Sequence, residues 1–70
     1  MKIVMESLSE LPEQTRHIFV LNRLDYKSRK EIASILGVSQ QKVDYHINKA
    51  NDHLRLKLKD YIPLMLLFLN

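Results

Sequence analysis

The sequence predicts an all-α fold: a small four-helix domain that contains a helix-turn-helix and carries an apolar C-terminal tail. Apolar residues recur at helical spacing over most of the chain, and the only glycine, Gly37, stands between two such stretches. Each of these two stretches is preceded by a serine suited to cap a helix, Ser28 and Ser39. With 70 residues, 46% of them hydrophobic, the chain can form one domain with one core. We expect the domain to span residues 1–61 and the tail residues 62–70.

Two helices are expected before the helix-turn-helix. The first covers residues 2–10, where apolar residues recur with helical spacing. The second covers residues 12–23, because Pro12 suits a first helical turn and Glu13 is favourable beside the positive end of the helix dipole. We expect Thr15 on its inner side. Arg16 and Arg23 share a face, where surface ion pairs and phosphate contacts are equally compatible with the spacing.

The third helix, residues 29–36, and the turn after it have clear local signals. Ser28 and Glu31 have the spacing of a capping box, in which each side chain bonds to the backbone of the other residue. Gly37 suits the left-handed conformation that ends a helix. Val38, apolar within the turn, is expected to fill the gap between the third and fourth helices.

The fourth helix is expected over residues 40–61, capped by Ser39. One side forms an apolar stripe, and the opposite side carries polar residues with lysines on its flank. An ordinary helical hairpin would have the same stripe, but the polar and basic opposite side favours DNA binding. The stripe consists of Val43, Ile47, Ala50, Leu54 and Leu58, and the opposite side of Gln41, Tyr45, Asn48 and Asp52, flanked by Lys42 and Lys49.

Residues in the first turn of a recognition helix usually meet the edges of bases, and here they are Gln40, Gln41 and Lys42. Glutamine and asparagine can pair with adenine, and lysine can donate to guanine. Tyr45 can contact a thymine methyl group or a phosphate. Asp44 and Asp52 oppose a purely electrostatic mode of binding.

The composition excludes several kinds of chemistry. There is no cysteine, so the chain has neither a disulfide framework nor a thiolate metal site. His46 and His53 are seven residues apart, but no further ligands have the spacing of a zinc site, and we expect both at the surface or its boundary. No nucleophile–base pair or phosphate-binding loop is present, so we expect no enzyme, no cofactor and no metal. The net charge of +3 suits a polyanionic partner, and the absence of cysteine suits the cytoplasm.

The chain resembles region 4 of sigma-70-type transcription initiation factors, most closely the extracytoplasmic-function subgroup and especially its Bacteroidetes members. Nearly the whole chain takes part, and the Leu-Pro-Glu at 11–13 favours a sigma factor over response-regulator output domains, which share the Lys-Glu-Ile-Ala signal. The family usually has glycine at the position of Tyr26, so we expect a different bend in the connector. The shared motifs are Leu11-Pro12-Glu13, Lys30-Glu31-Ile32-Ala33, Leu36-Gly37-Val38-Ser39, Val43, His46-Ile47, Ala50, Leu54-Arg55 and the leucine-rich tail.

This resemblance implies a domain that reads the promoter −35 element through the fourth helix and docks on the β flap of the RNA polymerase core. The region that melts the −10 element is not part of the match, so the isolated domain is expected to bind DNA weakly and with strong salt dependence. The predicted DNA contacts are Arg29, Lys30, Ser39, Gln40, Gln41, Lys42, Tyr45, His46 and Lys49.

Two other functions are compatible with the same residues. A response-regulator output domain would dimerise through residues 52–61, and a protein-interaction module would bind a partner such as an anti-sigma factor. The tail at 62–70 is too short to span a bilayer, so we expect no membrane contact. Such an apolar run can fold back on the domain, dock on a further domain or partner, or pair with a second copy of the chain, and of these we favour self-association.

Overall fold

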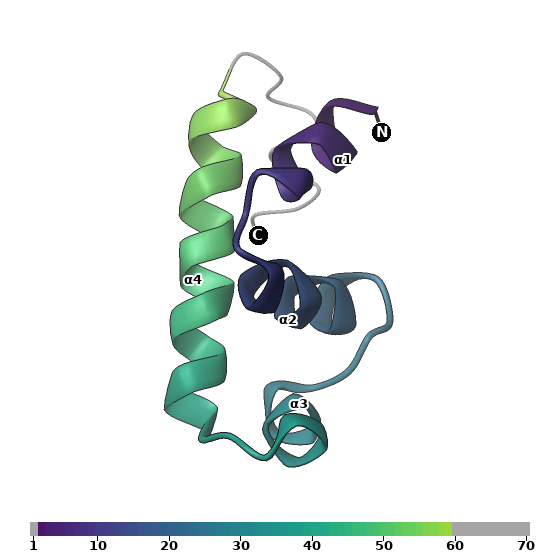
Figure 1. Ribbon diagram of the computed structural model, residues 1–70, viewed down its shortest axis with the longest axis vertical. Helices are drawn as coiled ribbons and strands as arrows, with labels where there is room; N and C mark the ends of the chain where they lie inside the picture. The colour runs from purple at the N-terminus through teal and green to yellow at the C-terminus, as the bar shows by residue number, and fades with distance from the viewer. Residues whose placement is uncertain (1, 60–70) are drawn as a thin grey trace.

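The computed structural model describes residues 2–59, which form four α-helices joined by short connectors. They are α1 (Lys2–Ser9), α2 (Glu13–Arg23), α3 (Arg29–Leu36) and α4 (Gln40–Lys57), and residues 2–59 contain no strand. α4 forms one long side of the molecule, and α1, α2 and α3 follow one another along it (Figure 1). The predicted all-α fold with a helix-turn-helix is confirmed.

Serine side chains start the two helices of the helix-turn-helix. The hydroxyl of Ser28 accepts a hydrogen bond from the backbone N–H of Glu31 at 3.0 Å, and the backbone N–H of Ser28 donates to the Glu31 carboxylate at 2.9 Å. This is the predicted capping box. At the start of α4, the hydroxyl of Ser39 accepts from the backbone N–H of Lys42 at 3.1 Å. These bonds satisfy donors that a helix leaves unpaired in its first turn.

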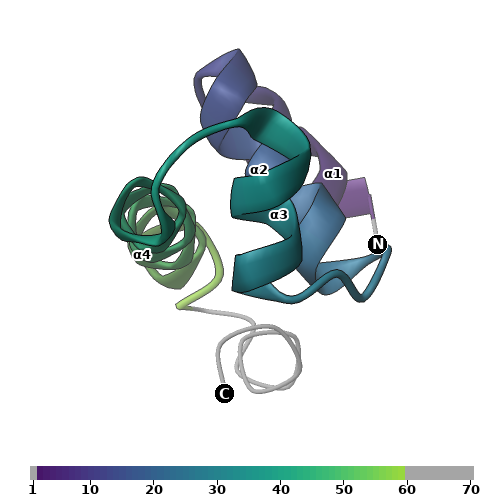
Figure 2. The ribbon, with the colours of Figure 1, turned by 90° about the horizontal axis from the view of Figure 1, so that it is seen from below.

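Gly37 makes the sharp change of direction between α3 and α4. It has a φ of +67°, and the carbonyl of Ala33 accepts from the backbone N–H groups of both Gly37 and Val38. Val38 packs against the core between the two helices, as predicted. Seen from below, α4 is viewed almost along its axis while α3 lies across the view, so the helices cross steeply (Figure 2).

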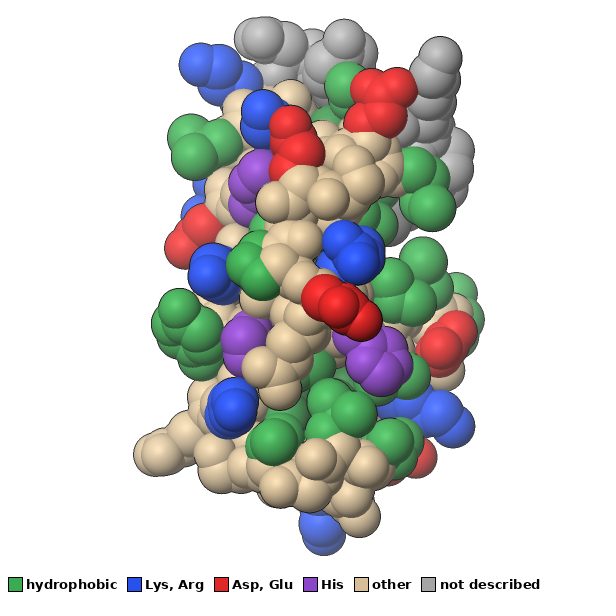
Figure 3. Space-filling view, in the orientation of Figure 1, with side chains coloured by type: hydrophobic (Ala, Val, Ile, Leu, Met, Phe, Trp, Pro, Cys, Tyr) green, Lys and Arg blue, Asp and Glu red, His purple; other side chains and the backbone are tan. Residues whose placement is uncertain are grey.

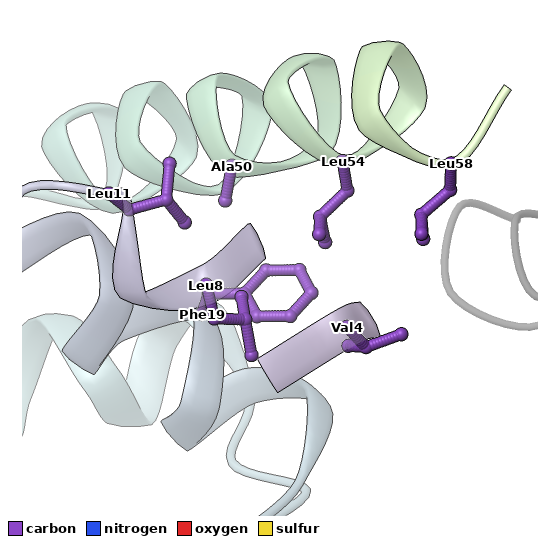
Figure 4. Packing of buried hydrophobic residues seen from close by; sticks show 7 residues of the cluster. All are labelled: Val4, Leu8, Leu11, Phe19, Ala50, Leu54 and Leu58. Atoms are coloured by element: carbon purple, nitrogen blue, oxygen red, sulfur yellow. The ribbon is translucent and has the colours of Figure 1, made fainter. Parts of the chain in front are cut away.

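The apolar stripe of α4 is shared by two hydrophobic clusters. All five predicted stripe residues are completely buried, with an exposed fraction of 0%. Ile18 and Phe19, adjacent in α2, pack into different clusters. The first cluster, at the α1 end, contains Val4, Leu8, Leu11, Phe19, Ala50, Leu54 and Leu58 (Figure 4). The second, at the α3 end, contains Ile18, Ile32, Ala33, Val43 and Ile47.

The predicted end of the fourth helix is wrong by four residues. α4 stops at Lys57 rather than at residue 61, and Leu58 closes it by donating its N–H to the Leu54 carbonyl at 2.8 Å. Neither glycine nor proline stands at this end, so the sequence has no local stop signal there. The apolar tail predicted for residues 62–70 lies outside the described residues. Within residues 2–59 no helix is both long enough and apolar enough to cross a membrane.

Candidate nucleic-acid interface

The polar side of α4 faces away from both hydrophobic clusters. The apolar stripe is buried against the other three helices, and so the opposite side of α4 remains open to a ligand. On the side of the molecule that Figure 3 shows, the basic side chains are separated by acidic, histidine and other residues and do not form one patch. We call this open side the outer face of α4, and its exposed residues are Gln40, Gln41, Lys42, Tyr45, Asn48, Lys49 and Asp52.

Tyr45 is the one large aromatic residue of the outer face, and its side chain has neighbours on two sides. The residue is 58% exposed. Its ring meets the ring of His46 edge-on, with centroids 5.1 Å apart and an interplanar angle of 76°. The ammonium group of Lys49 lies 5.8 Å from the Tyr45 centroid, within range of a cation–π interaction. The phenol ring thus contacts two neighbours on α4, and Tyr45 still has more than half of its surface exposed.

His46 is buried, so the prediction that it is a surface or boundary residue is wrong. Its exposed fraction is 8%, and its Nδ1 atom lies 2.8 Å from the hydroxyl of the fully buried Thr15 on α2. Burial lowers the pKa of the imidazole, and the positive charges of Lys42 and Lys49 lower it further. His46 therefore joins α4 to α2 as a neutral residue, and we leave it out of the contact set.

Arg29 and Asp44 form an ion pair that the sequence analysis did not anticipate. The guanidinium of Arg29, the first residue of α3, lies 2.7 Å from the carboxylate of Asp44 on α4. The pair is about half exposed. Arg29 remains near the surface with Lys30, where both were predicted to contact DNA, but one arm of its guanidinium is already occupied. The sequence signal that could have indicated this pair is the opposite charge of the two residues, which lie on the two helices of the helix-turn-helix.

A second charged cluster ties the C-terminal half of α4 to the end of α1. Glu10 lies 3.1 Å from the imidazole of His53 and 3.3 Å from the ammonium of Lys57. The hydrogen bond from Lys57 is the main cause of a lowered Glu10 pKa, with a smaller contribution from His53. His53 also contacts the carbonyl of Ser7 at 3.0 Å. His53 is thus a boundary residue with a structural role, as expected.

The two arginines of α2 have structural surroundings. Arg16 is partly buried and donates to the carbonyl of Leu11 at 3.3 Å. The Nε of Arg23 is buried and has no hydrogen-bond partner among the described residues. In that part of the chain neither arginine forms an ion pair. The surface pairing considered for them from the sequence is therefore absent from residues 2–59.

Other kinds of site have little support in residues 2–59. No three His, Asp or Glu side chains there are placed to hold a metal ion. A hollow of about 470 Å³ lies beside α2 and the end of α3, lined by Glu13, Gln14, His17 and Leu36. This lining has one apolar residue and no cluster of cations. The outer face of α4 is the better candidate for binding a large polar partner such as DNA.

Comparison with known proteins agrees with this geometry. The family described as sigma-70, region 4 matches residues 1–54, which include α1, α2, α3 and most of α4. No curated protein and no solved structure matches the chain. Region 4 domains are DNA-binding regulatory domains, not enzymes, and they bind promoter DNA and RNA polymerase. The match covers more than half of the chain, and the chain belongs to the sigma-70 region 4 family.

Proposed function

We propose that the outer face of α4 enters the major groove of the promoter −35 element and that the chain serves as the upstream DNA-binding module of a sigma factor. Recognition of the −35 element is the general role of this family. The observation that carries the proposal is the placement of Gln40, Gln41 and Lys42 in the exposed first turn of a capped helix. In a helix-turn-helix protein, this turn meets the edges of the bases.

The charged residues around this turn suit the phosphate backbone. Lys30 is exposed at the start of α3, and Lys42 and Lys49 lie on one flank of the outer face of α4. Cationic side chains placed beside the groove fix the register of the protein on the duplex, and the bases are read by other side chains. The proposed contact set is Arg29, Lys30, Ser39, Gln40, Gln41, Lys42, Tyr45 and Lys49.

The partners of the proposed function follow from the family resemblance. We assign the chain to the extracytoplasmic-function subgroup, supported by the His46-Ile47 pair and the leucine-rich tail. In this subgroup region 4 docks on the β flap of polymerase, and a second DNA-binding module raises the effective concentration of the first. The proposed place of action is the cytoplasm, where promoter DNA and polymerase meet. The same proposal includes two further partners: an anti-sigma factor, and a second copy of the chain bound through residues 62–70.

Charge reversal tests the proposal. Lys42→Glu places a negative charge in the groove and should weaken binding to duplex DNA by about tenfold or more at low salt. Lys59→Glu changes the net charge equally, but residue 59 follows the far end of α4, so its effect should be much smaller. Fluorescence anisotropy with a labelled duplex measures both variants. Equal losses in the two variants would reject the outer face as the binding site, and an unchanged Lys42→Glu variant would favour a protein-interaction module.

A further inference from the structure

The outer face of α4 carries no arginine, one of the two side chains that most often read guanine. Bidentate contacts from arginine or lysine are the commonest specific contacts to guanine, and carboxylates accept from the amino group of cytosine. Residues 40–52 contain no arginine. The side chains that do occupy the centre of this face, Gln41, Tyr45 and Asn48, are exposed.

The nearby arginines and carboxylates are paired with one another. Arg29 and Asp44 are joined at 2.7 Å on one flank of the outer face. Arg55 and Asp52 are joined at 3.3 Å further along α4. Each pairing uses an arginine donor and a carboxylate acceptor that could otherwise read a G·C pair. The ion pairs therefore reduce the capacity of this surface to select guanine or cytosine.

The two lysines of the face, Lys42 and Lys49, lie on its flank, and the ammonium group of Lys49 lies 5.8 Å from the centroid of the Tyr45 ring. The central amides have different chemistry. An asparagine or glutamine amide donates one hydrogen bond and accepts another, which matches N7 and the amino group of adenine in the major groove. The exposed Tyr45 ring offers an apolar surface to the thymine methyl group.

The spacing of these three residues fits neighbouring base pairs. A helix rises 1.5 Å per residue, so Gln41 and Asn48 are separated by roughly 10 Å along α4, or roughly three base-pair steps. Tyr45 lies between them. All three side chains therefore lie on one side of α4, within about two helical turns.

Resting on the proposed function, we propose that α4 reads A·T pairs, with Gln41 and Asn48 bound to adenines and Tyr45 against a thymine methyl group. The ligand is therefore a duplex with a short A·T-rich stretch in the half-turn contacted by α4.

The test combines selection with matched variants of the 70-residue chain. Duplexes are selected from a random pool at low salt, and dissociation constants are then measured by anisotropy. Wild type should enrich A·T pairs at adjacent positions, and a G·C pair at one of them should weaken binding about five- to hundredfold. Gln41→Ala and Asn48→Ala should each remove the preference at one position. Gln14→Ala, which removes an exposed amide from α2, should retain both preferences.

Base analogues test the role of Tyr45. Replacing thymine by deoxyuridine removes only the methyl group and should weaken wild-type binding about threefold. Tyr45→Ala should bind the two duplexes equally. Enrichment of G·C pairs, or no sequence preference, overturns the inference and leaves the proposed function standing. A folded wild-type chain that binds no duplex at low salt overturns the proposed function and the inference with it.

Discussion

At the scale of single residues, the bond between His46 and Thr15 shows how a histidine beside a basic surface is kept neutral. His46 is buried against α2, and Lys42 and Lys49 stand on the exposed side next to it. Burial and two neighbouring cations all oppose protonation, so the pKa of His46 in the folded protein lies below 6.5. The unfolded chain, which lacks these surroundings, binds a proton more readily.

This difference predicts a pH-dependent stability. Because the unfolded state binds more protons in this window, the free energy of unfolding rises with pH. The contribution of His46 to the free energy of unfolding is present above pH 6.5. It is lost as the pH falls below that value and through the lowered pKa of His46 in the folded protein. We expect urea unfolding at about pH 5.5 to show a lower free energy of unfolding than at about pH 7.5.

His46→Asn provides the control for this prediction. The asparagine amide can occupy the place of Nδ1 beside Thr15, but it does not titrate. The fall in stability between the two pH values should therefore be smaller in the variant than in wild type. Equal pH dependence in the two proteins would show that His46 does not cause it.

At the scale of elements, the helix-turn-helix is the part that local sequence determines best. The capping box of α3, the left-handed Gly37 and the Ser39 cap depend on residues no more than five positions apart, and all were predicted correctly. The polar side of α4 was also predicted, because the period that identifies a buried stripe identifies its opposite side.

Longer-range features were not predictable. His46 lies about 60° from Val43 around the helix axis, at the edge of the stripe, so its burial depends on what α2 offers there. The offered group is Thr15, 31 positions away in the sequence. The pairing of Arg29 with Asp44 likewise depends on how α3 crosses α4. The bend at Tyr26 is a local feature by contrast. Tyr26 adopts a φ of +59°, a conformation that glycine takes freely and that tyrosine seldom adopts, so the connector has here the backbone conformation that a glycine would favour.

Substitutions of Ser39, the cap of α4, can change the stability of the domain and its binding to DNA separately. Ser39→Ala removes the acceptor for the Lys42 N–H and should lower the free energy of unfolding by about 1 kcal/mol. Ser39→Asp retains an acceptor and should stay near wild-type stability. Its negative charge at the proposed groove should nevertheless weaken binding to DNA.

Urea unfolding and anisotropy measured on the same samples check both effects. Ser34→Ala, which changes an exposed serine within α3, is the control and should change neither quantity appreciably. If Ser39→Asp bound DNA as tightly as wild type, the start of α4 could not lie in the groove. If it were as unstable as Ser39→Ala, the cap would not account for the loss.

At the scale of the whole molecule, α4 supplies residues to both hydrophobic clusters, and stability depends on its buried stripe. Leu54 and Leu56 are two residues apart on α4, yet Leu54 is 0% exposed and Leu56 is 72% exposed. Leu54→Ala should cost about 2–5 kcal/mol, because it leaves a cavity among Phe19 and its neighbours. A domain of this size has a total stability of only a few kcal/mol, so we expect the variant to be largely unfolded.

Leu56→Ala is the matched control, since it makes the same chemical change on the exposed side. It should alter the free energy of unfolding by less than about 0.5 kcal/mol. Thermal unfolding followed by circular dichroism distinguishes the two variants. A cooperative transition near the wild-type temperature for Leu54→Ala would contradict the packing of the first cluster.

The contribution of neighbouring α2 residues to different clusters also has a dynamic consequence. Phe19 packs with α1 and the far half of α4, whereas Ile18 packs with α3 and the near half. Transient detachment of α1 would therefore expose Phe19 and leave Ile18 covered. During such an opening, amide protons in the helix-turn-helix would still exchange slowly with solvent. The outer face of α4 can therefore keep its shape while α1 detaches from the rest of the domain and packs against it again.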